Sequence, residues 1–211
     1  RPIVGQEKSA FNFRDVMDTK KILLVNLSKG RLGDINSHLL GLIIVGKLLM
    51  AALSRGEIPQ DQRKDFYLYI DEFQNVTTKA IATILSEARK YRLNLTMAHQ
   101  FIGQLEDDIK KAIFGNVGSM IAFRIGADDA EFVEQQFEPV FAAHDLLNID
   151  NYHAYVKLLL NGQTSRPFNI RTLPTPQGNR TIAEAVKEFS SITYGVPREQ
   201  VEEMIMRKFK K

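Results

Sequence analysis

Short apolar runs with almost no polar interruption alternate with helical patterns up to residue 125, and this alternation limits the fold more than any other feature. The runs are residues 21–27, 66–70, 93–98 and 120–125. The helical patterns are residues 36–53, 78–91 and 102–114. Strands without alternating polar residues are typical of parallel sheets that helices cover on both faces. We therefore predict an α/β fold with a mainly parallel sheet and helices on both of its faces.

The chain changes character after residue 137. The dipeptide Asn161-Gly162 separates two apolar segments, as expected for a β-hairpin. Two prolines and Gly178 then form a linker before two helical patterns. The hairpin strands are expected at residues 152–160 and 166–170, and the helices at residues 181–189 and 197–209. We expect residues 1–172 to form the main domain and residues 173–211 to form a linker with a small helical tail.

The composition excludes several kinds of chemistry. Hydrophobic residues make up 44% of the chain, which suffices for a packed core, and the net charge of +3 permits a polyanionic partner without requiring one. The chain has no cysteine, so it has no disulfide, thiolate zinc site or cysteine nucleophile. Its four histidines are scattered, and no serine has the G-x-S-x-G context. Carboxylate, amide and arginine chemistry remains.

One stretch, residues 39–53, is apolar enough to raise the question of a membrane span. It has 15 residues and contains Lys47, whereas about 20 residues are needed to cross a bilayer. We predict a buried helix here and no membrane segment in this chain.

Polar side chains follow two of the predicted strands at the point where each strand ends. Asp71 and Glu72 follow residues 66–70, and Gln100 follows residues 93–98. The carboxyl ends of strands form the ligand-binding edge of open α/β sheets. There, one carboxylate can hold Mg²⁺, the next can polarise a water, and a neutral amide can contact a phosphate. The alternatives are that Asp71 caps the following helix and that His99 and Gln100 form a solvated turn.

Four blocks of sequence resemble a known family. They are VNLSKGRLG at residues 25–33, YIDEF at residues 69–73, LSEARKYRLNLTMAHQ at residues 85–100 and GNVGSMIAFRIGADDA at residues 115–130. Together they resemble the HerA/FtsK superfamily of motor ATPases, and within it the TraG/TraD conjugative coupling proteins of type IV secretion systems. The resemblance implies a RecA-like fold, ATP with Mg²⁺, assembly into a hexameric ring and sequence-independent DNA binding. It also implies secretion-channel proteins as partners and a cytoplasmic location, at the inner face of the membrane through regions outside this chain.

The resemblance also implies roles for individual residues. Asp71 and Glu72 correspond to the Walker B pair, with Asp71 as the Mg²⁺ ligand, and Gln100 corresponds to the γ-phosphate sensor. Arg124 corresponds to a position near the subunit boundary, where an arginine reaching a neighbour's γ-phosphate raises the rate by about 10³ to 10⁵. The alternative for Arg124 is a salt bridge to Asp128, Asp129 or Glu131.

Four cations are candidates for sequence-independent contact with DNA phosphates. They are Lys29, Arg31, Lys110 and Lys111. The alternative for each of them is an ordinary solvated surface charge. The sequence shows no series of aromatic residues that would stack with bases.

The chain departs from the family in its phosphate-binding loop. The closest string, Gly41 to Leu48, fits G-x-x-x-x-G-K but has Leu48 in place of Ser or Thr, and its helical, apolar character does not suit a phosphate cradle. We expect the loop to lie upstream of Arg1, so that this chain is the C-terminal half of the motor and is inactive alone. The alternatives are an inactive homologue that serves in assembly or DNA binding, and a nuclease that uses Asp128 or Asp129 as further metal ligands.

Overall fold

The computed structural model describes residue 6, residues 8–77 and residues 85–209. Its helices are α1 (Phe13–Asp18), α2 (Lys29–Leu32), α3 (Asp34–Leu53), α5 (Asp107–Asn116), α6 (Ala127–Phe137), α7 (Ala143–Leu147), α8 (Arg180–Tyr194) and α9 (Arg198–Phe209). Its strands are β1 (Phe66–Ile70), β2 (Leu93–Met97), β3 (Met120–Ala122), β4 (His153–Lys157), β5 (Leu159–Leu160), β6 (Gln163–Thr164) and β7 (Phe168–Arg171). Short 3₁₀ turns are η1 (Ser54–Glu57), η2 (Phe73–Val76), η3 (Ala88–Tyr91) and η4 (Ile102–Gln104). Residues 78–84 of the helix predicted over 78–91 lie outside the described residues.

The strands β1 and β2 form a parallel pair, in which Leu68 lies opposite Leu95. Phe66, Leu68 and Ile70 alternate along β1 and pack into the core beneath α3, because alternate side chains of a strand share one face. Tyr67 and Tyr69 on the opposite face of β1 are exposed. Among the described residues this face therefore lacks the helical cover that was predicted.

The second sheet is antiparallel and has the order β3-β4-β7. The single, mainly parallel sheet predicted from the sequence is therefore not observed, because β3 pairs with β4 and not with the β1-β2 pair. The predicted hairpin is confirmed. Asn161 and Gly162 join β5 to β6 with φ angles of +51° and +80°, as a two-residue hairpin turn requires.

The strand predicted over residues 21–27 is wrong, because this segment has no regular secondary structure. Its backbone hydrogen bonds do not join it to another strand. Lys21 N donates a hydrogen bond to Val16 O, and Leu27 O accepts a hydrogen bond from the Ser37 hydroxyl. Ile22 and Leu24 are exposed. The segment, β1 and α3 together line a hollow of about 1430 Å³.

Helix α3 begins at Asp34, two residues before the helical pattern predicted over residues 36–53. Gly33 precedes it with a φ angle of +79° and no side-chain cap. The side-chain amide of Asn36 donates a hydrogen bond to Leu32 O, four residues earlier in the chain. The predicted buried helix is confirmed on one face, whose buried residues are Ser37, Gly41, Val45, Leu48, Ala51 and Ala52.

Two further features of α3 bear on the sequence predictions. Together with η1, it is long and apolar enough to cross a membrane by the criteria of length and composition. The string from Gly41 to Leu48 lies inside the helix, which confirms that it is not a phosphate-binding loop.

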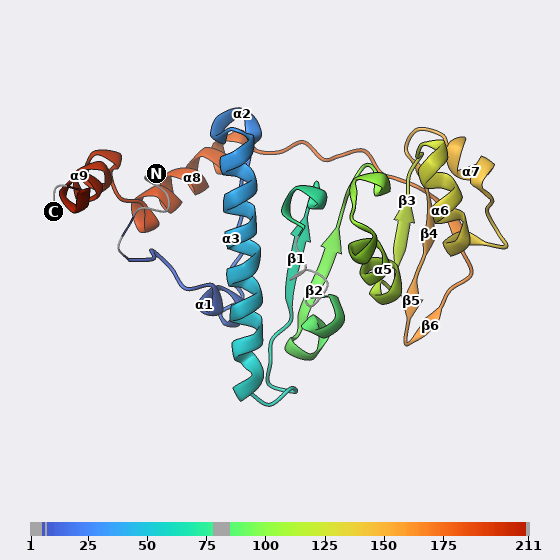
Figure 1. The fold of residues 1–211 in the computed structure, drawn as a ribbon, viewed down its shortest axis with the longest axis horizontal. Coiled ribbons are helices and arrows are strands. Elements are labelled where there is room, and N and C mark those ends of the chain that lie inside the picture. The colour runs from blue at the N-terminus through green and yellow to red at the C-terminus, as the bar shows by residue number, and fades with distance from the viewer. Residues whose placement is uncertain (1–5, 7, 78–84, 210–211) are drawn as a thin grey trace.

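Figure 1 shows β1, β2 and β3 pointing the same way, with α3 beside β1 and with α6 and α7 beside the second sheet. After β7 the chain crosses to the opposite end of the molecule, where α8 and α9 lie (Figure 1). These two helices confirm the predicted helical tail. The ring of Tyr194 contacts that of Phe11 edge-on, at a centroid distance of 6.1 Å.

Candidate functional site

The parallel pairing of β1 and β2 continues past the ends of both strands. Ala98 N donates to Ile70 O at 2.9 Å, and Phe73 N donates to Ala98 O at 3.0 Å. These two bonds fix the segments after the strands next to each other. The residue pairs Asp71-Glu72 and His99-Gln100 therefore emerge at one edge of the sheet, as predicted.

The carboxylate of Glu72 is the centre of the resulting cluster. Its Oε1 accepts a hydrogen bond from the Gln100 amide, and its Oε2 accepts one from the Gln74 amide at 2.5 Å. The predicted meeting of Glu72 and Gln100 is thus observed. Gln74, in the turn η2, was missed by sequence reasoning, because its contact depends on the left-handed backbone of Glu72, with φ +48° and ψ +47°.

The side chain of Asp71 is exposed beside this cluster. Its Oδ1 accepts from Glu72 N at 3.0 Å, so it does not cap a helix as the alternative reading required. Mg²⁺ is usually held by one or two carboxylates together with water and substrate phosphates, and Asp71 with Glu72 suits that ligand set. The described part of the chain contains no group of three or more His, Asp or Glu that could hold a metal ion, which the nuclease alternative requires.

His99 is half-buried and not fully solvated as the turn alternative implied. Its ring contacts Phe73 edge-on, with the ring centroids 5.1 Å apart. Burial lowers the pKa of His99 below its usual value, while the charges of Asp129 and Glu72 and the backbone of Phe101 oppose this shift. The site therefore favours a neutral imidazole next to the Glu72 carboxylate.

The four candidate DNA-binding cations lie on two separate helices. On α2, Lys29 donates to Asn75 Oδ1 at 3.0 Å and pairs with Asp34 at 2.8 Å, and Arg31 is exposed. On α5, Lys110 pairs with Asp107 at 3.3 Å, and Lys111 is exposed. Lys29 is thereby attached to the turn that follows Glu72. No sequence signal pointed to the contact with Asn75.

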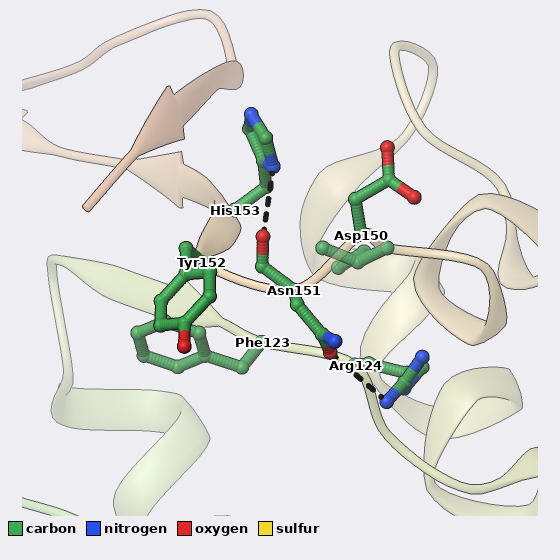
Figure 2. A pocket seen from close by; sticks show the side chains of 7 residues that line it. Phe123, Arg124, Asp150, Asn151, Tyr152 and His153 are labelled. Carbon is green, nitrogen blue, oxygen red and sulfur yellow. Dashed lines mark hydrogen bonds between the residues drawn. The ribbon is translucent and has the colours of Figure 1, made fainter.

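Arg124 follows β3 and lines a hollow of about 220 Å³, shown in Figure 2. Its Nη2 donates to Asn151 Oδ1 at 3.3 Å. Among the described residues Arg124 forms no ion pair, so the alternative salt bridge to Asp128, Asp129 or Glu131 is not observed. Asp129 instead accepts a hydrogen bond from Ile102 N at 3.0 Å.

Comparisons with known proteins locate relatives of this fold. Residues 65–136 match the family described as the TraM recognition site of TraD and TraG. No curated protein matches the chain. The fold is similar to the plasmid coupling protein TrwB in complex with ADP and Mg²⁺, with a TM-score of 0.53 and 20% identity, over 65% of this chain and 37% of that one.

Two further solved structures are similar. The unbound monoclinic form of the bacterial conjugative coupling protein TrwBdeltaN70 has a TM-score of 0.53 and 19% identity, over 69% of this chain and 38% of that one. The genome packaging NTPase B204 of Sulfolobus turreted icosahedral virus 2, in complex with AMPPCP, has a TM-score of 0.49 and 15% identity, over 75% of this chain and 71% of that one.

This chain therefore spans a little over a third of the length of the coupling protein it matches. The family match includes β1, β2 and β3, together with Asp71, Glu72 and Gln100 at the strand ends. The resemblance to the TraG/TraD proteins that the sequence predicted is confirmed for residues 65–136, which match the TraD and TraG family model, and the fold is similar to that of the coupling protein TrwB.

Proposed function

We propose that this chain supplies the carboxylate and amide half of the ATP site of a motor that translocates DNA. The observation that carries the proposal is the hydrogen bond from the Gln100 amide to the Glu72 carboxylate, which joins the ends of two adjacent parallel strands. Ligands of open α/β sheets bind at this edge. The family match and the nucleotide in the TrwB structure support the same reading.

Each residue of the cluster has a distinct task in this proposal. Asp71, which is exposed, would hold Mg²⁺, and the ion would neutralise charge on the β- and γ-phosphates of ATP. Glu72 accepts the proton of the attacking water. The amides of Gln100 and Gln74 fix the direction of the Glu72 carboxylate, and Gln100 contacts the γ-phosphate without adding negative charge.

The backbone amides and the lysine that hold the phosphates come, in this proposal, from a part of the parent protein outside this chain. The sequence contains no G-x-x-x-x-G-K followed by Ser or Thr, and its nearest match lies within α3. The isolated 211-residue chain is therefore expected to release no phosphate from MgATP. Phosphate release that disappears in Glu72→Gln would contradict the proposal of a half-site.

The proposal extends to the assembly of the whole protein. Copies form a hexameric ring, in which Arg124 lies near the boundary with a neighbouring copy. DNA is the cargo and binds without sequence preference, with Lys29, Arg31, Lys110 and Lys111 as candidate contacts. A TraM-type protein is the proposed partner of residues 65–136, and the ring works at the cytoplasmic face of a secretion channel.

The decisive variant is Glu72→Gln in the parent protein. It keeps the size of the side chain and removes the base, so ATP turnover should fall by roughly 10² to 10⁴ while ATP binding persists. Glu131→Gln, on the exposed face of α6, is the matched control and should retain full turnover. Unchanged turnover in Glu72→Gln would remove Glu72 from its proposed role.

The absence of an intact phosphate-binding loop from the 211 residues favours one alternative. In it, the chain belongs to an inactive homologue that retains the fold in order to assemble with an active partner or to bind DNA. The sequence of the parent gene discriminates between the two. An intact G-x-x-x-x-G-K-[ST] directly after a strand supports the motor, and its absence supports the inactive homologue.

A further inference from the structure

The hollow beside Arg124 has the composition of a site for one planar group. Its lining includes the buried Ile149, 3% exposed, and the rings of Phe123 and Tyr152, which are 53% and 71% exposed. Its volume of about 220 Å³ is below the roughly 300 to 1,000 Å³ of pockets that enclose a whole drug-sized ligand. The hollow therefore suits a single ring system whose remaining atoms stay outside.

The backbone holds Tyr152 at the surface in an unusual conformation. Its φ angle is +66°, in a turn that the bond from His153 N to Asp150 O closes at 3.1 Å. Gly or Asn usually takes such a position, because a bulky side chain is strained there. The carbonyl of Tyr152 accepts two bonds from Thr172, from N at 2.7 Å and from Oγ1 at 3.0 Å. Retained strain of this kind is typical of functional positions.

Arg124 gives the hollow a cation with hydrogen-bond donors that are available to a ligand. Its one hydrogen bond to Asn151 leaves most of its five N–H donors available, and it has no carboxylate partner within the described ranges. A guanidinium fits two oxygens of a phosphate at once. Asp150 also lines the hollow, but its carboxylate points away from Arg124 in Figure 2.

We propose that Phe123, Tyr152 and Arg124 bind one nucleotide unit, with its base stacked on the two rings and its phosphate on the guanidinium. The unit comes from a single strand of DNA or from a free nucleotide, since both offer an unpaired base beside a phosphate. Stacking needs no base-specific hydrogen bond, so the site is insensitive to sequence. This inference deepens the proposed function and rests on it for the presence of nucleotides. It also supplies the aromatic contact that the sequence alone did not reveal.

The test is binding of a fluorescein-labelled oligothymidylate and of AMP to the 211-residue chain, in buffer that contains EDTA and no ATP. Phe123→Ala and Tyr152→Ala should each weaken binding by roughly 5- to 150-fold, the effect of one stacked base. Tyr152→Phe retains the ring and should bind as the wild type does. Phe189→Ala removes an exposed ring on α8, away from the hollow, and should also leave binding unchanged.

Two further arms identify the source of the nucleotide and test the cation. If the two alanine substitutions weaken the binding of the labelled strand but not of AMP, the site is assigned to single-stranded DNA. If they weaken the binding of AMP but not of the strand, the site is assigned to a free nucleotide. Arg124→Gln should reduce the salt dependence of strand binding by about one unit in the slope of log K against log salt.

Failure of either probe to bind the wild-type chain overturns the inference for that source. Equal affinity of the wild type, Phe123→Ala and Tyr152→Ala for both probes overturns it altogether, as does an equal loss in Phe189→Ala. Circular dichroism of each variant separates lost binding from lost folding. Because the assay contains neither Mg²⁺ nor ATP, its failure leaves the proposed ATP half-site standing.

Discussion

Arg55 carries a charge that is fully buried and has partners on three different segments. Its guanidinium pairs with Asp18 of α1 at 3.0 Å and donates to the carbonyl oxygens of Lys64 and Tyr91. The side chain therefore joins α1 to the segment before β1 and to the end of η3. No spacing in the sequence indicates this arrangement, because Asp18 and Tyr91 lie 37 and 36 residues from Arg55 in the chain.

Removing the partner of this charge should be costly. Asp18→Ala leaves the Arg55 guanidinium buried without its counter-ion, which should lower the free energy of unfolding. We expect a loss of about 3 kcal/mol, the low end of the range for a buried ion pair, because Asp18 itself is partly exposed. Urea unfolding followed by circular dichroism measures the change. Asp15→Ala, on the exposed side of the same helix, is the control and should change stability by no more than about 0.5 kcal/mol. Equal stability of the two variants would contradict the buried ion pair.

His99 gives the fold a dependence on pH. Because burial lowers its pKa in the folded chain, the unfolded chain binds a proton at a higher pH than the folded chain does. The contribution of His99 to stability is therefore complete above about pH 6.5 and decreases as the pH falls below that value. Urea unfolding across this range should show a weaker pH dependence in His99→Gln. Identical curves for the wild type and His99→Gln would refute the assignment.

At the level of elements, the packing of α3 depends on a glycine. A Cβ on Gly41 would collide with Cγ1 of the buried Val76, whereas a Cβ on Gly46 of the same helix would meet no atom within 4 Å. Gly46→Ala should therefore raise the free energy of unfolding by about 0.5 to 1 kcal/mol, as helix propensity predicts. Gly41→Ala should instead lower it by about 1 to 2 kcal/mol, because overpacking outweighs propensity. Thermal unfolding of the two variants measures the direction of each change in stability. Stabilisation by Gly41→Ala would show that α3 does not approach η2 this closely.

The sequence predicted β1 and β2 well, because each is an apolar run with polar residues directly after it. The same signal failed at residues 21–27, since an apolar run does not specify a partner for its backbone hydrogen bonds. It also failed to show that β3 pairs with β4, because that pairing depends on a hairpin more than 25 residues further along the chain. Three of the four apolar runs thus form strands, but the runs did not indicate which sheet β3 joins.

The sequence likewise predicted some residues of the candidate site and not others. Glu72 and Gln100 were predicted because both follow strands, and parallel strands bring such positions to one edge. Gln74, Asn151 and Tyr152 were not predicted, because their contacts depend on turns and on backbone angles that residue type does not determine. For Tyr152 the residue type points away from a left-handed conformation.

At the scale of the whole molecule, the tail contributes little to the core. Helix α8 has no buried residue, and its apolar side chains Ile182, Val186 and Phe189 are exposed. The tail contributes the ring contact of Tyr194 with Phe11 and the burial of Val201 on α9, 1% exposed. These two contributions are worth about 1 and 2 kcal/mol respectively.

The fragment of residues 1–172 should therefore fold without the tail. A loss of about 3 kcal/mol corresponds to a decrease of about 10 °C in the midpoint of thermal unfolding for a chain of this size. Circular dichroism should show one cooperative transition at that lower temperature. A fragment ending at residue 152 is the control, because it lacks β4 and β7 and so leaves β3 without its antiparallel partner. This control should lose the cooperative transition. If the 1–172 fragment loses it as well, the boundary at residue 172 is wrong and the tail helices belong to the folding unit of the sheets.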